Sequence, residues 1–516
     1  MKRTLALSSI ALIAFTLISK VIGMARDMAM AYYFGASSLS DAYITAVAIL
    51  TMLSAAALAS LVVSYIPIIS GKDDRQVSAI TSNFMSVLSY GTLCVSLVAI
   101  FFTRQLVYLF ASGFQEDTIK QTSLILKISL PFMFFTVILN LSIGYLQHKN
   151  QFWYQGFSAV LSSILILVSI VVSRKNLEVL AVGYAASMVL PAVLGLLLAQ
   201  KNGLSFHPAF RLKDAHLHEL IRISIPIFVS QLLIQINIIV DKNFSSSIGS
   251  GIMTDLDYAY RISILLISVF ITSIATVLFP TLSRQAVEAD RSAFKSTLRK
   301  GINITTLLTV PMMVGTIVLA HELIELALMR GNFNQIAANI TAQSLIMYSL
   351  CVPAQGYIYI LNNAFFSMKD TKTPVFCGAF SIILNILLNC ILVRILSYRG
   401  LALATSISVI LNVTLYFFFM RKRIGSYGLK NIGGLFLKTL AAALLMGAIL
   451  WLLKVPISTT FGTAMGGRLC SLCLLVFLGV IAYFGLCMLF RISLLNEVWD
   501  DLVKKISKAF SHRNSL

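Results

Sequence analysis

Residues 19–43 read SKVIGMARDMAMAYYFGASSLSDAY and join two long hydrophobic runs. This stretch carries four ionisable residues, Lys20, Arg26, Asp27 and Asp41, at or near the ends of those runs. An ionisable side chain at the centre of a transmembrane helix costs roughly 2.5 to 3.5 kcal/mol on insertion scales, so such groups are expected to face a wet cavity or a charged partner. The stretch therefore indicates a membrane fold and is the first candidate for a transport site.

The composition of the whole chain supports a membrane fold. Of its 516 residues, 58% are hydrophobic and 12% are charged, and the mean hydropathy is +0.88. These values exclude an ordinary soluble protein and predict an all-α polytopic membrane protein. The formal net charge is +20, but the basic residues are scattered between apolar runs, so we expect no nucleic-acid partner. The charge is better explained by membrane topology and attraction to anionic lipid.

Apolar runs of about 20 residues or more, long enough to cross a bilayer, predict about fourteen helices. The runs lie near residues 4–25, 42–70, 79–103, 121–146, 152–173, 178–199, 217–244, 256–283, 296–320, 338–367, 373–395, 400–420, 436–455 and 468–490. The first run resembles a signal peptide, but so many similar runs follow it that we expect a retained helix. An even count puts both termini on one side. The larger share of the 40 Lys and Arg residues then places that side in the cytoplasm.

The two halves of the chain repeat several spacings. Asp27 and Asp41 are separated by the same number of residues as Asp241 and Asp255, and Asn140 and Asn362 are among several pairs with one common offset. These repeated spacings predict two parallel six-helix repeats around a central cavity, with alternating access. The expected parts are an N-terminal lobe at 1–199, a cytoplasmic linker at 200–216, a C-terminal lobe at 217–425, helices thirteen and fourteen at 436–490 and a cytoplasmic amphipathic tail at 491–516.

Three cationic residues in or near the spans suggest a substrate site. Arg26 and Arg261 carry guanidinium groups that match phosphate or carboxylate geometry in a bidentate way, and Lys20 adds a point charge. Facing the cavity, they would bind an anionic substrate. In the alternative interpretation, each side chain reaches the membrane interface or pairs with a neighbouring aspartate, namely Asp27, Asp255 or Asp257.

A second cluster is more polar than charged. Asp241, Asn385, Asn389 and Thr405 lie in three apolar runs, and Asn385 and Asn389 share one helical face because they are four residues apart. One carboxylate with amide and hydroxyl oxygens would suit a small hard cation such as sodium. The alternative is that the amides and the hydroxyl hold helices together by interhelical hydrogen bonds.

Motifs typical of enzymes are missing from the sequence. His321 and Glu322 are followed at the next helical position by Glu325 rather than a second histidine, so the zinc-protease pattern fails. Cys470 and Cys473 form a CxxC pair that opens an intramembrane helix, where neither a redox nor a zinc role is expected. There is no GxxxxGK[ST] loop. We therefore expect a transporter without a cofactor, driven by a sodium ion, the membrane potential or substrate flow.

Four stretches are similar to a known family. They are SKVIGMARDMAMAYYFGASSLSDAY at 19–43, DYAYRISILLISVFITSIATVLFPTLSR at 257–284, FFSMKDTKTPVFCGAFSIILNILLN at 365–389 and RGLALATSISVILNVTLYFFFMRKRIG at 399–425. They resemble the lipid II flippases of the MurJ/MviN family, within the multidrug/oligosaccharidyl-lipid/polysaccharide exporter superfamily. The resemblance implies a bacterial inner-membrane flippase that turns undecaprenyl-diphosphate-linked peptidoglycan precursor from the inner to the outer leaflet. It also implies a monomer, with the cell-wall synthesis machinery as a possible partner.

The resemblance assigns roles to individual residues. The cavity arginines of the family fall on Lys20, which is a conservative departure, and on Arg26 and Arg261, with an aspartate at Asp41. The sodium site described in the family falls on Asp241, Asn385, Asn389 and Thr405, where Asn389 replaces an aspartate. Helices thirteen and fourteen are implied to form a groove for the polyprenyl tail.

A larger departure lies in the second helix. A further cavity arginine of the family falls on Ser54 and a glutamate on Ala59. A flippase for another lipid-linked oligosaccharide, of exopolysaccharide or O-antigen type, is therefore the main alternative. A multidrug antiporter would need a carboxylate trap for cations rather than a cationic cavity. A non-transporting scaffold for cell-wall or polysaccharide synthesis is the alternative from a different functional class.

Overall fold

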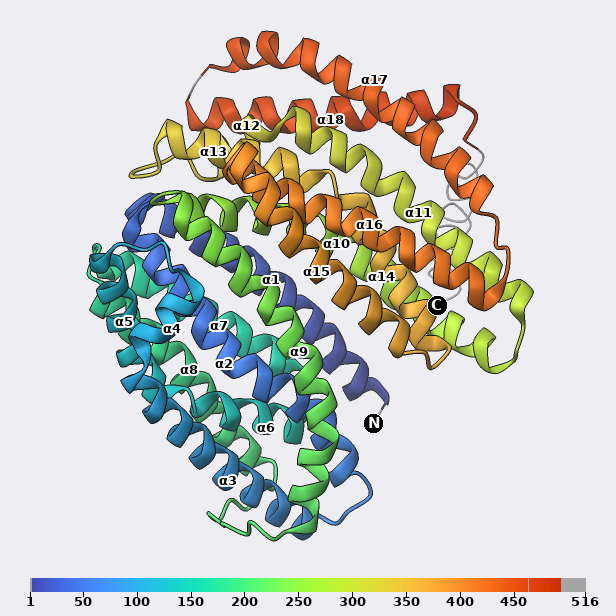
Figure 1. Cartoon of the computed structure of the whole chain (residues 1–516). Coiled ribbons are helices and arrows are strands. Elements are labelled where there is room, and N and C mark those ends of the chain that lie inside the picture. Colours follow the sequence, from blue (N-terminus) through green and yellow to red (C-terminus); the bar gives the residue numbers. More distant parts are fainter. Residues whose placement is uncertain (1, 463, 493–516) are drawn as a thin grey trace. The chain divides into compact units, whose positions relative to one another are not determined.

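The computed structural model describes residues 2–462 and 464–492. Within these ranges the side chains of 2–7, 9, 55–63, 226–234 and several positions between 266 and 277 are not described. The described residues form helices joined by turns and loops and contain no strand, as the predicted all-α class requires. Figure 1 shows the course of these helices. The predicted amphipathic tail at 491–516 lies almost entirely outside the described residues.

The chain divides into two compact units. Unit 1 comprises Met1–Asp255 together with Leu328–Ala337, and unit 2 comprises Leu256–Ala327 together with Ala338–Leu516. The helices of unit 1 are α1 Lys2–Phe34, α2 Ser38–Ile69, α3 Asp74–Phe101, α4 Thr103–Phe110, α5 Glu116–Ser129, the 3-10 turn η1 Leu130–Phe132, α6 Phe135–His148, α7 Trp153–Ser173, α8 Leu177–Lys201 and α9 Ala215–Ile248.

Two helices cross the boundary between the units. They are α10 Ile252–Val287 and α13 Gln335–Ser349. The remaining helices of unit 2 are α11 Arg291–Val318, α12 Ala320–Ala327, α14 Val352–Ser367, α15 Lys372–Leu396, α16 Tyr398–Ile424, α17 Leu429–Phe461 and α18 Met465–Leu489.

Each predicted apolar run overlaps one of these helices or one bent pair. In the described part of the chain, eight helices are long and apolar enough to cross a membrane, or up to ten if each bent pair is one span. The predicted count of about fourteen spans is compatible with these values, which cover the described residues only, and stays a prediction.

Two of the predicted runs are bent rather than straight. The first bend, of 46°, separates α5 with η1 from α6, and the second, of 47°, separates α13 from α14. A proline lies at each break, Pro131 in η1 and Pro353 at the start of α14. Proline has no amide hydrogen and its ring collides with the preceding turn, so a helix bends or ends there. A hydropathy pattern cannot detect such a break because the apolar residues continue through it.

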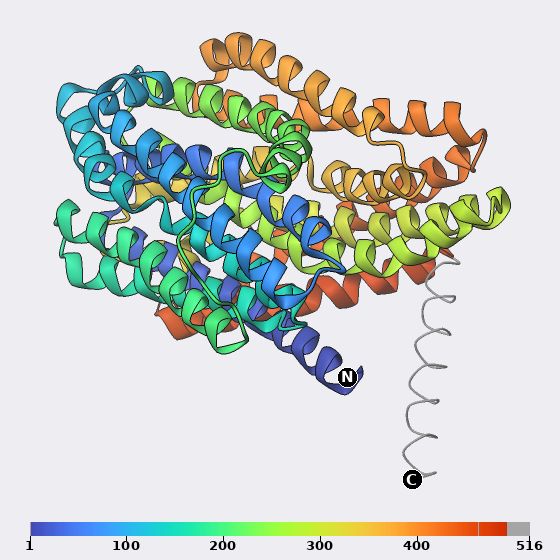
Figure 2. The same cartoon turned by 90° about the horizontal axis from the view of Figure 1, so that it is seen from below.

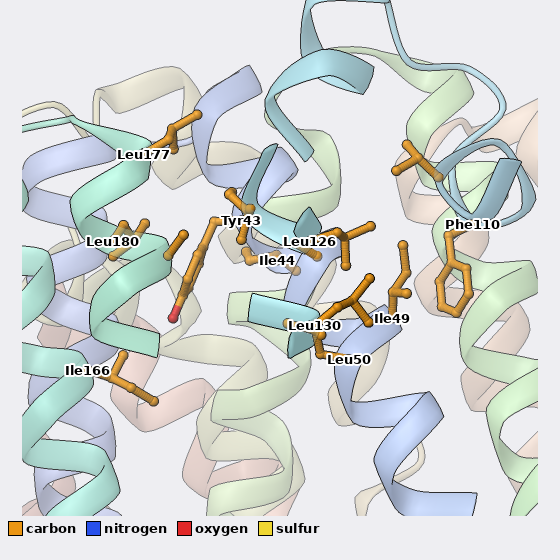
Figure 3. Close-up of a cluster of buried hydrophobic side chains, with 14 of the residues drawn as sticks. Tyr43, Ile44, Ile49, Leu50, Phe110, Leu126, Leu130, Ile166, Leu177 and Leu180 are labelled. Atoms are coloured by element: carbon orange, nitrogen blue, oxygen red, sulfur yellow. The ribbon is translucent and has the colours of Figure 1, made fainter. Parts of the chain in front are cut away.

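The core of unit 1 lies around α2. Helix α2 packs against α5, α6 and α9, while α1 packs against α7. Ile49 and Leu50 are fully buried in this core. Figure 3 shows this cluster, in which the side chains of α2 lie beside those of α5, α7 and α8, with Tyr43, Ile44, Ile49, Leu50, Phe110, Leu126, Leu130, Ile166, Leu177 and Leu180 labelled. The packing fixes the start of α2, where the candidate residue Asp41 lies.

The linker between α8 and α9 is an extended strap rather than a loose loop, and Figure 2 shows it as a green non-helical segment. Three serines spaced four residues apart on α3 accept hydrogen bonds from alternate backbone amides of this linker. The pairs are Ser205 N to Ser78 Oγ at 3.3 Å, His207 N to Ser82 Oγ at 3.2 Å and Ala209 N to Ser86 Oγ at 3.1 Å. Four helical residues rise about 6 Å and two extended residues rise about 6.6 Å, so the two repeats stay in register.

We expect the triple variant Ser78→Ala/Ser82→Ala/Ser86→Ala to expose the strap to protease. Each lost hydrogen bond contributes about 0.5 to 1.5 kcal/mol, so trypsin cleavage at Arg211 and Lys213 should become at least about tenfold faster. The matched control is Ser89→Ala/Ser96→Ala on the same helix, since the hydroxyl of Ser96 bonds only within α3. Equal cleavage rates in the triple variant and the control would show that the serines do not hold the linker.

Unit 2 has a core of its own between α11, α17 and α18. Tyr483 on α18 donates a hydrogen bond to the carbonyl oxygen of Leu307 on α11 at 2.9 Å. Two ion pairs join α12 to the same hairpin, Lys454 to Glu322 and Arg468 to Glu325, both at 3.5 Å. Helices thirteen and fourteen of the prediction, α17 and α18, are thus packed onto α11 and α12, and the lipid-tail groove stays a prediction.

Candidate functional site

The two predicted cations of unit 1 lie on α1. Arg26 is half-buried and forms an ion pair with the adjacent Asp27, with Nη2 to Oδ1 at 2.9 Å and Nε to Oδ1 at 3.1 Å. Lys20 is also half-buried and forms no ion pair with any described residue. The pairing of Arg26 with Asp27 is one of the contacts expected under the alternative interpretation. It occupies two donors of the guanidinium group and leaves Nη1 for another anion.

Asp41 holds the start of α10. Its carboxylate is buried, with 1% exposure. Oδ2 accepts a hydrogen bond from Gly251 N at 2.6 Å, and Oδ1 accepts two from Thr254, from the amide at 2.9 Å and from the hydroxyl at 2.6 Å. An anion at a helix N-terminus satisfies backbone amides that have no partner inside the helix. The structure therefore shows Asp41 as a capping residue within unit 1.

The backbone around this cap requires glycine. Gly251 has a φ of +84°, and a Cβ atom there would lie 2.6 Å from the carbonyl oxygen of Ala36. Both the left-handed conformation and the close approach exclude a larger side chain. The family resemblance placed Asp41 in the substrate site, and no pattern in the sequence indicated that its partners would lie in 251–254.

Arg261 belongs to unit 2. It lies on α10, where its Nε forms an ion pair with Oδ2 of Asp257 one helical turn earlier, at 2.6 Å. Its side chain is 42% exposed and that of Asp257 is 20% exposed. Pairing with Asp257 is again one of the contacts of the alternative interpretation. Lys20, Arg26 and Asp41 belong to unit 1, so the substrate site that combines these residues with Arg261 stays a prediction.

The polar cluster is also divided between the units. Asp241 on α9 of unit 1 accepts a hydrogen bond from Asn237 at 3.2 Å. In unit 2, Asn389 donates to Asn385 at 3.0 Å and Asn385 donates to Thr405 at 3.3 Å, which links α15 to α16. Asn385 and Asn389 are almost fully buried. This chain of hydrogen bonds is the interhelical arrangement named as the alternative. Asn385 Oδ1 and Thr405 Oγ1 accept hydrogen bonds within it, and sodium binding stays a prediction.

The sequence did not indicate a role for Asn332. Its amide and its side chain both donate to the carbonyl oxygen of Tyr32, at 2.9 and 3.1 Å, and the side chain also donates to that of Tyr33 at 2.8 Å. Its Oδ1 accepts from Lys175 at 3.2 Å. These contacts bind the segment Leu328–Ala337 to the end of α1 within unit 1.

Ser54 and Ala59 are the two positions of the second helix where the chain departs from the family, and the structure describes the side chain of Ser54 only. Ser54 is half-buried and its hydroxyl donates to the carbonyl oxygen of Leu50 at 2.6 Å, within α2. It therefore brings no charge to this face of the helix. The side chain of Ala59 lies outside the described residues.

Comparison with known proteins identifies the family. A family model described as Lipid II flippase MurJ matches residues 30–466. The chain belongs to this family. The family name describes a flippase, which is a transporter and not an enzyme, in agreement with the sequence analysis. The chain is accordingly a multi-pass membrane protein of the MurJ family.

Relatives match the chain over most of its length. A protein of Vibrio cholerae serotype O1 named "Probable lipid II flippase MurJ" is 28% identical over 94% of this chain and 96% of its own length. A protein of Burkholderia cenocepacia named "Lipid II flippase MurJ" is 26% identical over 79% of this chain and 82% of its own length. A solved structure titled "Lipid II flippase MurJ, inward closed conformation" has a TM-score of 0.79 and 25% identity, covering 95% of this chain and all of that one.

The fold is shared more widely than the family. An inward-facing multidrug resistance transporter of the MATE family and the MOP superfamily has a TM-score of 0.65 at 16% identity, over 81% of this chain. At this identity the likeness shows the fold alone. Membership of the larger exporter superfamily stays a prediction.

Proposed function

We propose that this protein is a lipid II flippase, which moves undecaprenyl-diphosphate-linked peptidoglycan precursor from the inner to the outer leaflet of the bacterial inner membrane. The observation that carries the proposal is the MurJ family match over residues 30–466, joined by a MurJ structure that covers 95% of the chain. The protein contains cations on long apolar helices, which suit a substrate whose charge is a diphosphate between an apolar tail and a polar headgroup.

The proposed mechanism is alternating access. Arg26 and Lys20 on α1 and Arg261 on α10 bind the diphosphate while the polyprenyl tail stays in the lipid. A change in the arrangement of the lobes then opens the site to the other leaflet. Arginine suits this role because its planar guanidinium group donates two parallel hydrogen bonds to a phosphate and stays charged. A sodium gradient or the membrane potential would supply the driving force, with Asp241, Asn385, Asn389 and Thr405 as the proposed cation ligands.

The proposal extends to topology and partners. Both termini are cytoplasmic, because that orientation leaves most basic residues on the cytoplasmic side. The working unit is a monomer surrounded by membrane lipids, with the cell-wall synthesis machinery as the partner that supplies or consumes the lipid-linked substrate.

A flippase for another lipid-linked oligosaccharide is the second candidate, and Ser54 is the observation that favours it. Where the family has an arginine, this chain has an uncharged hydroxyl that bonds to its own helix. A cavity with one cation fewer binds a diphosphate less strongly. Such a cavity would suit a substrate that gains more of its binding energy from the glycan.

Rescue of cells depleted of their own lipid II flippase tests both candidates. We expect the wild-type chain to restore growth and cell shape, with Ser54→Arg equal to or better than wild type because it adds a cation where the family has one. Membrane expression of each variant is measured in parallel. If the wild-type chain reaches the membrane but neither it nor Ser54→Arg restores growth, the lipid II proposal is wrong and the second candidate replaces it.

A further inference from the structure

Unit 2 contains a pocket that none of the proposed transport residues lines. It has a volume of about 600 Å³ and is formed where the end of α10, the start of α11, the α14–α15 turn and the end of α16 meet. These segments lie together at the lower right of Figure 1. They belong to the side of the protein that is predicted to be cytoplasmic.

Three cations from three different segments line this pocket. They are Arg291 at the start of α11, Lys369 in the α14–α15 turn and Arg423 in the last turn of α16. All three side chains are exposed. None forms an ion pair with any residue in the described part of the chain. Basic residues that only set the membrane topology have no reason to line the same pocket. These three residues do line one pocket.

The neighbouring carboxylates are occupied by other groups. Asp290 caps α11 by accepting hydrogen bonds from the amides of Ser292 and Ala293, at 3.1 and 2.9 Å. Glu288 lies 4.0 Å from Arg284. The pocket thus keeps an excess of positive charge, and a concave surface lined by one sign of charge concentrates the opposite ion.

A third carboxylate, Asp370, caps α15. It accepts hydrogen bonds from the amide and the hydroxyl of Thr373, at 3.0 and 2.8 Å. Partial burial acts to raise the pKa of this carboxyl, but those hydrogen bonds and the charge of Arg423 lower it below the ordinary value. Asp370 is therefore ionised and directed at the backbone of α15, and it weakens the positive field of Arg423 without closing the pocket.

The floor of the pocket is apolar. Phe294 and Ile424 are buried there. Apolar walls exclude water and strengthen the electrostatic interactions at the rim. Two guanidinium groups and one ammonium group around such a floor match the oxygens of a tetrahedral, multiply charged anion.

We propose that this pocket of unit 2 binds a phosphate group. Two sources share this chemistry, the headgroup of an anionic phospholipid and a phosphate anion in solution. The site is separate from the diphosphate site of the proposed function, because it uses none of Lys20, Arg26 or Arg261.

The test uses the purified full-length protein in a neutral detergent. Thermal unfolding is followed while inorganic phosphate is titrated at constant ionic strength against chloride. In a second arm, dioctanoyl phosphatidylglycerol is titrated against dioctanoyl phosphatidylcholine. The pocket variant is Lys369→Gln/Arg423→Gln. The control is Lys372→Gln/Arg421→Gln. Like the pocket variant, it removes one lysine charge and one arginine charge, but it changes no residue that lines the pocket.

We expect phosphate, phosphatidylglycerol or both to raise the unfolding temperature of the wild type, the control and Arg26→Ala/Arg261→Ala. The pocket variant should bind at least about tenfold more weakly, because it loses the charge-assisted hydrogen bonds that two of the three cations would donate to the phosphate group. An effect confined to the lipid arm would identify a headgroup as the source, and one confined to the salt arm a soluble anion. The absence of any effect on the wild type, or equal losses in the pocket and control variants, would overturn the proposal. Equal unfolding temperatures without ligand show that the variants are folded.

Discussion

Replacing Arg26 and Arg261 with alanine should abolish rescue of flippase-depleted cells, and each single replacement should reduce transport by at least about tenfold. A hydrogen bond to a charged group contributes about 1.5 to 3 kcal/mol, so losing the contacts of one guanidinium group lowers binding roughly 10-fold to 150-fold. The measurement is growth rescue together with lipid II accessibility at the outer leaflet. Both arginines pair with an aspartate in the structure, and those pairs use only part of the donor set of arginine.

Two controls separate a role in transport from a structural role. Arg104→Ala removes an exposed surface pair with Glu116 and should leave rescue unchanged, because such pairs contribute little. Arg26→Lys keeps the charge but not the fork geometry, and should retain part of the activity. Full rescue by the double alanine variant at normal membrane levels would rule out the proposed diphosphate site and favour the scaffold alternative.

Asp41→Ala should lower the stability of the protein more than any other single carboxylate replacement in unit 1. The change leaves the amides of Gly251 and Thr254 without their acceptor in a buried place, while the hydroxyl of Thr254 keeps Ser40 Oγ as an acceptor at 3.0 Å. A buried donor left without a partner costs about 1 to 3 kcal/mol, so we expect a loss of about 2 to 5 kcal/mol. Thermal unfolding of the purified protein in detergent measures the effect.

The matched control for Asp41 is Asp117→Ala. This carboxylate is 89% exposed and lies 3.7 Å from Lys120, so its removal should change the unfolding temperature little. Asp41→Asn keeps an acceptor oxygen and should fall between the two. If Asp41→Ala unfolds at the wild-type temperature yet transports no substrate, its role lies in substrate binding, as the resemblance implied, and not in capping α10.

The fold class and the family could be predicted from the sequence. Long apolar runs can satisfy their backbone only as helices when they cross a bilayer, so composition and hydropathy indicated an all-α membrane protein. The four quoted stretches indicated the MurJ family by their resemblance to it. The helix breaks at Pro131 and Pro353 were missed, because hydropathy averages over a bend.

The partners of the candidate residues could not be predicted. Arg26 is next to Asp27 in the sequence, and Asp257 lies one helical turn before Arg261. The sequence therefore predicted these two ion pairs as the alternative to a substrate site. The partner of Asp41 is backbone more than two hundred residues away, and that of Asn332 is the end of α1.

The sequence by itself determined that this protein is a helical membrane transporter of the MurJ family with cations on its spans. Local composition is sufficient for the helical membrane class, because each helix makes its own backbone hydrogen bonds within the bilayer. The family followed from the resemblance of the four quoted stretches. Only the tertiary structure decided that Asp41 caps a distant helix, that serines of α3 hold the linker and that three cations of unit 2 surround one pocket. Those features depend on contacts between segments far apart in the chain. A local pattern in the sequence carries no information about such contacts.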